Sequence, residues 1–120
     1  MRTKCMSALA LGIFLAGPAL AAPPGVTELE GVWIAPDGKP LYTFGRDTTG
    51  VSNCNDRCAS AWPPLLADDD TGADADWSVI GRADGSRMWA YKGQPVYTFA
   101  QDTPGEAATG VSTTWPLAKR

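Results

Sequence analysis

The fold of this 120-residue chain is decided by the stretch GKPLYTFGRDTTG at residues 38–50 and its near-copy GQPVYTFAQDTPG at residues 93–105. Eight of the thirteen positions are identical at a constant offset of 55. Successive side chains of a strand point to opposite faces, so the Tyr and Phe of each copy share one face. We expect these rings to meet in a common core: Tyr42, Phe44, Tyr97 and Phe99.

The repetition extends beyond these stretches. Shorter echoes follow in the same order: Trp62-Pro63 with Trp115-Pro116, and Gly50-Val51-Ser52 with Gly110-Val111-Ser112. Two copies are too few for an open solenoid, so we expect the two units to pack on each other across a pseudo-twofold axis. The units correspond to about residues 31–66 and 86–118 of a single duplicated domain.

Each unit has the pattern of a β-hairpin. In the first, residues 32–35 lead into Pro36-Asp37-Gly38, where Pro presets one backbone dihedral and Gly accepts a positive one. The chain then returns along residues 41–46. In the second, residues 77–101 predict a three-stranded meander, because Asp84-Gly85 is a strong hairpin signal. The predicted fold is all-β: a small antiparallel β domain, sandwich-like or barrel-like.

Residues 1–21 have the three parts of a secretory signal, namely a basic start, an apolar run and a small-residue cleavage pattern at residues 19–21. The run is too short to span a bilayer, so we expect no stable membrane anchor after cleavage. Residues 22–120 then form one domain with eight basic and thirteen acidic residues, a net charge of −5. That charge argues against nucleic-acid binding. The predicted location is the bacterial periplasm or the medium.

Two cysteines, Cys54 and Cys58, remain after cleavage, and in an oxidising compartment a disulfide is expected. Positions four apart on a regular helix place their Cβ atoms farther apart than a disulfide accepts. Residues 55–57 are therefore predicted to form a tight or distorted turn. At most one short helix is expected, near residues 56–61, because no longer stretch repeats apolar residues at helical spacing.

The segments from Tyr42 to Asp47 and from Tyr97 to Asp102 resemble the Tyr-x-aromatic-x-x-Asp signature of a bacterial family described as a secreted repeat of unknown function, or predicted lipoprotein. Further segments match that family's pattern: Cys54 to Ala59, Trp62 to Leu65, Asp76 to Ile80, Trp89 to Tyr91, and Trp115. The resemblance covers nearly all of residues 22–120. It implies a secreted module with an association with alkane catabolism. Cys5 precedes the apolar run, so the chain lacks the lipid-accepting cysteine of anchored members.

Two roles are open for the repeated aspartates, Asp47 and Asp102. In the first, each ends a strand and accepts hydrogen bonds from backbone N–H groups two residues on, in turns completed by Gly50 and Gly105. In the second, the two carboxylates converge on a ligand or cation. Trp62 and Trp115, beside prolines, are the aromatic residues most expected to be exposed and to line a groove for a sugar or a small apolar molecule.

Most catalytic and metal-binding chemistry has little support in the residues present. The chain has no histidine, which removes the commonest general base and most zinc sites. Cys54 and Cys58 allow a Cu(I)-handling thiol pair, although few soft ligands accompany them. The acids of residues 68–76 do not match a calcium loop, and a solvated loop joining the units is expected.

We therefore expect no cofactor and a non-enzymatic binding or structural module. The alternatives are a small hydrolase or metal-dependent factor that uses Asp47 and Asp102, and the Cu(I)-handling protein.

Overall fold

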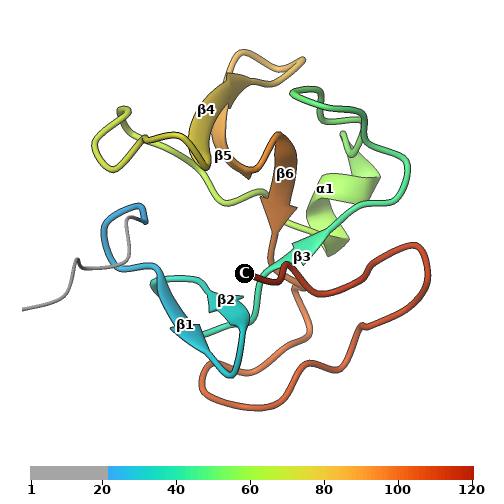
Figure 1. Ribbon diagram of the computed structural model, residues 1–120. Coiled ribbons are helices and arrows are strands. Elements are labelled where there is room, and N and C mark those ends of the chain that lie inside the picture. Colours follow the sequence, from blue (N-terminus) through green and yellow to red (C-terminus); the bar gives the residue numbers. More distant parts are fainter. Residues whose placement is uncertain (1–21) are drawn as a thin grey trace, which may run out of the picture.

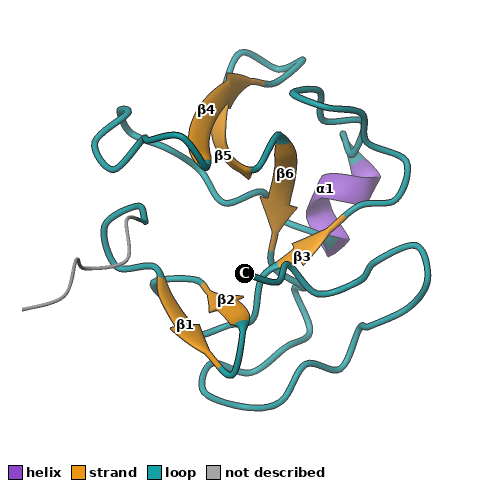
Figure 2. Ribbon diagram, viewed as in Figure 1, coloured by secondary structure: helices purple, strands orange, loops and turns teal. Residues whose placement is uncertain are grey.

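The computed structural model describes residues 22–120 (Figure 1), and the predicted signal at residues 1–21 lies outside the described residues. Seven elements follow in chain order: β1 (Thr27–Leu29), β2 (Val32–Ile34), β3 (Tyr42–Thr43), α1 (Arg57–Ala61), β4 (Trp77–Gly81), β5 (Arg87–Tyr91) and β6 (Gln94–Tyr97). The strands form two antiparallel sheets, of order β1-β2 and β3-β6-β5-β4 (Figure 2).

The predicted all-β class with one short helix is confirmed, and neither sheet closes into a barrel in this part of the chain. Within residues 22–120, no helix has the length and apolar character needed to cross a membrane.

The second unit contains the predicted meander. β4 pairs antiparallel with β5, with Val79 opposite Trp89, and β5 pairs antiparallel with β6, with Ala90 opposite Pro95. The turn between β4 and β5 includes Gly85 at a φ of 89°, a left-handed value that favours glycine. The hairpin signal at Asp84-Gly85 is therefore confirmed.

The first unit begins with a short hairpin that the sequence pattern did not predict. β1 pairs with β2, with Glu28 opposite Trp33. The two turn residues, Glu30 and Gly31, have φ angles of 52° and 84°. Two positive angles are what a two-residue type I′ turn requires, and Glu is a much weaker signal for this turn than Asn or Asp. This explains why the sequence did not reveal the hairpin.

After β2 the chain returns at Leu41, but the strand predicted over residues 41–46 is too long, because β3 ends at Thr43 and residues 45–46 form a turn. The N–H of Leu41 donates to the carbonyl oxygen of Trp33 at 2.9 Å, and Gly38 in the turn has a φ of 91°. The returning segment joins the two units, because β3 pairs antiparallel with β6 and places Tyr42 opposite Tyr97. The pseudo-twofold axis passes through this pair.

The two units exchange their Trp-Pro segments. The N–H of Thr43 in the first unit donates to the carbonyl oxygen of Pro116 in the second at 2.9 Å. Correspondingly, the N–H of Thr98 in the second unit donates to the carbonyl oxygen of Pro63 in the first, also at 2.9 Å. Each returning strand is thus flanked by the segment that ends the other unit, and the duplication produces an interlocked fold.

Two hydrogen bonds between glycines also link the units, and they show that one of the sequence similarities noted above does not mark equivalent positions. The N–H of Gly50 donates to the carbonyl oxygen of Gly93 at 2.7 Å, and the N–H of Gly105 donates to that of Gly38 at 2.9 Å. Gly50 is therefore structurally equivalent to Gly105. The similarity of residues 50–52 to residues 110–112 does not reflect equivalent positions.

The returning strands separate two apolar cores. Leu41 belongs to a cluster with Trp33 and Trp77, whereas its neighbour Tyr42 belongs to a second cluster with Tyr97. Leu41 and Tyr42 are both fully buried, because each face of the strand is covered. The predicted common core of motif rings is confirmed as the second cluster. The sequence did not show that the opposite face is buried as well.

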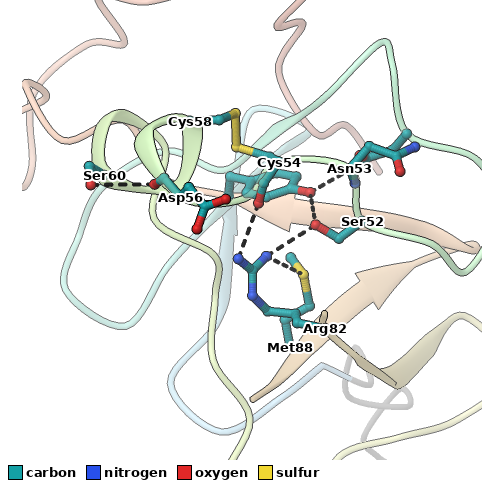
Figure 3. The surroundings of a disulfide bond; sticks show 10 residues. Ser52, Asn53, Cys54, Asp56, Cys58, Ser60, Arg82 and Met88 are labelled. Atoms are coloured by element: carbon teal, nitrogen blue, oxygen red, sulfur yellow. Dashed lines mark hydrogen bonds between the residues drawn. A yellow bond between two sulfur atoms is a disulfide. The ribbon is translucent and has the colours of Figure 1, made fainter. Parts of the chain in front are cut away.

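The short helix α1 follows the predicted distorted turn (Figure 3). Cys54 and Cys58 are joined by a disulfide with a Cα–Cα distance of 5.2 Å. The N–H of Cys58 donates to the carbonyl oxygen of Asn55 at 3.0 Å, and Asp56 has a φ of 53°. The chain between the cysteines is therefore a tight turn. The acidic segment 68–76 is an irregular, mostly exposed loop between the units, as predicted.

Candidate functional site

Four aromatic rings of the repeated motifs form a continuous stack in the second core. The ring centroids of Phe44 and Trp115 lie 4.2 Å apart, those of Trp115 and Trp62 4.0 Å, and those of Trp62 and Phe99 4.3 Å. The planes of the two tryptophans differ by 5°. Each Phe thus stacks on the tryptophan of the other unit, and the two tryptophans meet at the pseudo-twofold axis.

The motif tyrosines pack edge-on against this stack. Tyr42 meets Trp62 at 4.9 Å and 76°, and Tyr97 meets Trp115 at 5.3 Å and 89°. The expectation that both tryptophans are exposed is wrong, because Trp115 is 8 % exposed and Trp62 is half-buried. The exchange of the Trp-Pro segments places both tryptophans in the core that the two units share.

The tyrosine of each motif donates a hydrogen bond to the aspartate of the other motif. The hydroxyl of Tyr42 donates to Oδ2 of Asp102 at 2.7 Å, and the hydroxyl of Tyr97 donates to Oδ2 of Asp47 at 2.6 Å. Hydrogen bonds to charged acceptors are roughly twice as strong as neutral ones. These crossed Tyr–Asp pairs therefore fasten the two units to each other.

The second oxygen of each aspartate closes a wide loop. Oδ1 of Asp47 accepts the backbone N–H of Asn53 at 2.6 Å. Oδ1 of Asp102 accepts the backbone N–H of Thr109 at 2.8 Å and its hydroxyl at 2.6 Å. The prediction of a bond from the N–H two residues on is wrong, since the donors lie six and seven residues on. The aspartates anchor whole loops, and these donors had no sequence signal.

The two carboxylates ionise differently although their positions are equivalent. Burial raises the pKa of Asp47 and outweighs the hydrogen bonds from Tyr97 and Asn53. Burial also opposes ionisation of Asp102, but the hydrogen bonds from Thr109 and Tyr42 together outweigh it and lower the pKa of Asp102.

Their tyrosine partners are held in the protonated form. Burial, followed by the hydrogen bond to Asp102, raises the pKa of Tyr42 to about 12. Burial, followed by the hydrogen bond to Asp47, raises the pKa of Tyr97. Both hydroxyl groups therefore remain donors at neutral pH.

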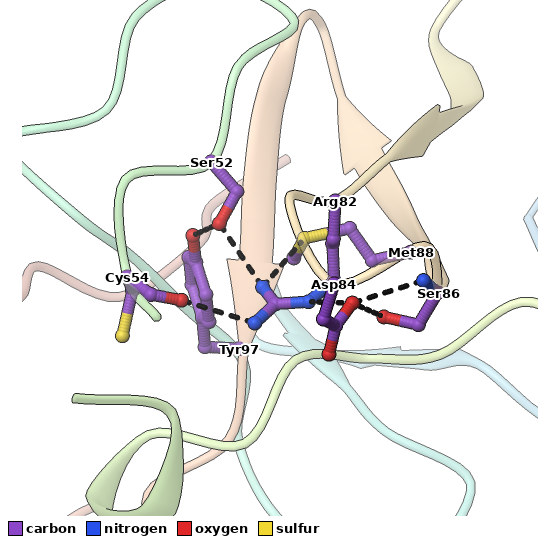
Figure 4. Close-up of polar contacts among 7 residues, drawn as sticks. All are labelled: Ser52, Cys54, Arg82, Asp84, Ser86, Met88 and Tyr97. Atoms are coloured by element: carbon purple, nitrogen blue, oxygen red, sulfur yellow. Dashed lines mark hydrogen bonds and ion pairs between the residues drawn. The ribbon is translucent and has the colours of Figure 1, made fainter. Parts of the chain in front are cut away.

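A buried arginine adjoins one of the crossed pairs (Figure 4). Arg82 is 8 % exposed, and its guanidinium donates to Oγ of Ser52 and to the carbonyl oxygen of Cys54, each at 3.1 Å. Oγ of Ser52 lies 2.6 Å from the hydroxyl of Tyr97. Asp84 lies 3.8 Å from Nε of Arg82. Sequence reasoning missed this residue, because an arginine at a turn normally lies on the surface.

The disulfide decides the state of the thiol pair. In the oxidised form, Cys54 and Cys58 provide no thiolate for Cu(I). Among residues 22–120, no three Cys, Asp or Glu side chains gather into a group that could hold a metal ion.

A solvent-facing apolar groove of about 690 Å³ lies on the first unit, and we name it the hairpin groove. Its floor is the outward face of the β1–β2 hairpin, and the loop 105–108 forms a wall. The apolar side chains that line it are Leu29, Val32, Ile34, Pro40, Ala107, Ala108 and Leu117. Leu29 is 64 % exposed. The sequence did not reveal this groove, because its walls come from distant segments.

The predicted site residues thus fall into one assembly. The structure brings together Tyr42, Phe44, Asp47, Trp62, Tyr97, Phe99, Asp102 and Trp115 around the pseudo-twofold axis. None of the motif aspartates, tyrosines or tryptophans lines the hairpin groove.

The repeated units match a known family model twice, over residues 28–66 and residues 78–119. The two matches contain the expected units at residues 31–66 and 86–118 and begin earlier, within β1 and within β4. A search of curated proteins and a search of solved structures each found no match. The model covers more than half of the chain, and the chain therefore belongs to the family described as a secreted repeat of unknown function.

Proposed function

We propose that this protein is a non-enzymatic binding module of the periplasm or the medium, whose motif residues build the core and whose hairpin groove is the binding surface. The observation that carries the proposal is the complete internal use of the motif. Both oxygens of Asp47 and of Asp102 accept hydrogen bonds from the chain itself. The motif therefore supports the fold and leaves the groove as the surface for a ligand.

The groove has the size and the apolar lining of a binding pocket. Its volume of about 690 Å³ lies within the range of roughly 300–1,000 Å³ typical of ligand pockets. The exposed face of a surface hairpin is normally polar, but Leu29, Val32 and Ile34 make this one apolar. An apolar ligand suits it better than a sugar, since the faces of Trp62 and Trp115 are covered by their own stack.

The enzymatic alternative has less support. A hydrolase would need carboxylates that face a substrate, but Asp47 and Asp102 each face a tyrosine of the other unit. A glycosidase would need two carboxylates held across a cleft, and neither aspartate lines the hairpin groove.

A neutral apolar dye, Nile red, tests the groove as a binding surface. We expect its fluorescence to rise with the wild-type protein and to fall at least tenfold in Leu29→Asp, because this substitution replaces apolar contact surface on the floor of the groove with a charged group. The matched control is Val111→Asp, at an exposed position outside the groove (55 % exposed), which should behave as wild type. Equal fluorescence in both variants would contradict the proposal.

A second experiment separates motif from groove. The double variant Asp47→Ala/Asp102→Ala should lower the midpoint of thermal unfolding while Nile red binding at low temperature stays at the wild-type level. Intact thermal stability with lost binding would instead support a ligand site at the aspartates.

A further inference from the structure

The two units have equivalent hairpins, so each position of the hairpin groove has a counterpart in the second unit. Glu28 lies opposite Trp33 in the first unit, as Val79 lies opposite Trp89 in the second. The N–H of Trp33 and that of Trp89 both donate to the segment exchanged from the other unit. The equivalent groove positions are Leu29 with Ile80, Val32 with Met88, and Ile34 with Ala90.

In the second unit these positions are covered. Met88 and Ala90 are fully buried, and the guanidinium of Arg82 lies 3.6 Å from Sδ of Met88. The same guanidinium is held by Ser52 and Cys54 of the adjacent loop. An arginine side chain therefore fills part of the space above this hairpin (Figure 4).

In the first unit the corresponding space is open. Val32 and Ile34 are only half-buried, and Leu29 is largely exposed. The difference follows from turn length, because Arg82 lies in a longer turn between β4 and β5, whereas Glu30 and Gly31 alone join β1 to β2. The first hairpin has no residue that could take the place of Arg82.

The hairpin groove of the first unit is lined by glutamates, whereas the corresponding space in the second unit holds Arg82. Glu28, Glu30 and Glu106 all line it. Glu28 accepts the N–H of Gly31 and pairs with Arg120 at 3.8 Å. Glu30 and Glu106 are exposed and form no ion pair within residues 22–120. The groove therefore combines an apolar floor with two carboxylates that lack a cation.

From this comparison we propose that the hairpin groove takes up an arginine side chain from a basic, partly apolar segment of a partner polypeptide. The inference rests on the proposed function and names the class of partner. Arginine suits the site because its stem packs on apolar surface while its planar guanidinium binds carboxylates. Leu29 and Val32 would contact the stem, and Glu30 and Glu106 would attract the guanidinium.

The test is an NMR titration of ¹⁵N-labelled protein with two synthetic probes, acetyl-Leu-Arg-Leu-Arg-amide and acetyl-Leu-Gln-Leu-Gln-amide. We expect the basic peptide to shift the amide resonances of residues 27–34 and 105–108. We expect it to bind at least tenfold more tightly than the neutral peptide. Added salt should reduce this difference, because exposed charges are screened.

Two variants locate the interaction. Glu30→Gln/Glu106→Gln should reduce binding of the arginine peptide to the level of the glutamine peptide, while Nile red binding stays unchanged. Asp68→Asn/Asp70→Asn, which removes two exposed acids outside the groove, should have no effect on either.

The outcomes distinguish the two proposals. Equal binding of both peptides in the groove would overturn the arginine inference and leave the binding module intact. Shifts outside the groove would also overturn it. If neither peptide nor Nile red reached residues 27–34, the proposed function itself would fail.

Discussion

Asp47 and Asp102 occupy equivalent positions, but Asp102 accepts one more hydrogen bond, from the Thr109 hydroxyl, and the two pKa values shift in opposite directions. The pKa of Asp47 is raised in the folded state, so its ionised form lowers stability at neutral pH. This cost is relieved as the pH falls through the folded pKa of Asp47 toward its ordinary value of 3.8. The pKa of Asp102 is lowered, so its ionised form stabilises the fold above 3.8. That contribution is lost as the pH falls below 3.8 through the folded pKa of Asp102.

The pH dependence of unfolding should therefore change differently in two variants. The wild-type protein should gain stability through Asp47 as the pH falls toward 3.8, and Asp47→Asn should abolish that gain. It should lose stability through Asp102 as the pH falls further, and Asp102→Asn should abolish that loss. At neutral pH, Asp102→Asn should cost about 1.5 to 3 kcal/mol, because it replaces a charged acceptor of three hydrogen bonds. Asp47→Asn should cost less. Urea unfolding at stepwise acidic pH measures both, and identical profiles would contradict the assignment.

Gly110 lies against the aromatic stack. A Cβ atom there would lie 2.7 Å from Cη2 of Trp62 and 2.8 Å from Cδ2 of Phe99. Gly110→Ala should therefore lower the free energy of unfolding by about 1 to 3 kcal/mol, the usual cost of overpacking a core. Gly81→Ala is the control, since nothing lies within 4 Å of a Cβ at that position. A loss of similar size in both variants would show that the stack yields to the added methyl group.

At the scale of elements, the disulfide constrains a loop of very few residues. Removing it in Cys54→Ala/Cys58→Ala should cost about 2 kcal/mol through the entropy of the unfolded chain. Cys54 is fully buried, so lost packing adds to this value. Hydrogen exchange should accelerate in α1 and in residues 52–56 but not in β4 or β5. Reduction of the wild-type protein separates the effect of the bond from that of packing, and uniform acceleration over all strands would contradict a local role.

The sequence predicted where the strands lie better than it predicted which segments pair with each other. The meander at residues 77–101 was predictable because alternation and an Asp-Gly turn are local properties. The exchange of Trp62 and Trp115 between units was not, since two similar segments can pair with either copy of the strand and the local pattern is the same in both cases. The pairing of each tyrosine with the distant aspartate escaped prediction for the same reason.

The candidate site shows the same division. The motif residues were predicted to gather, and they do. Arg82 and the hairpin groove were not predicted, because burial of an arginine and exposure of Leu29 depend on the lengths of two turns. Those lengths decide which segment covers which hairpin.

At the scale of the whole molecule, the interlocked units should stay together without a covalent link. The disulfide lies within the first unit, and the loop 68–76 is the connection between the two. Cleavage at a protease site inserted between Asp69 and Asp70 should leave both fragments in one complex on size exclusion and in native mass spectrometry. Added denaturant should separate them. Separation in buffer alone would contradict the structural importance of the exchange.

The same exchange limits what half of this molecule could be. A polypeptide with one unit would have an uncovered strand edge, and its Trp-Pro segment would have no strand to pair with. Two such polypeptides could cover both strand edges by exchanging their Trp-Pro segments about a true twofold axis. The architecture is thus that of a symmetric dimer joined into one chain, and the joined halves differ, because Arg82 covers the second hairpin while the first hairpin is open.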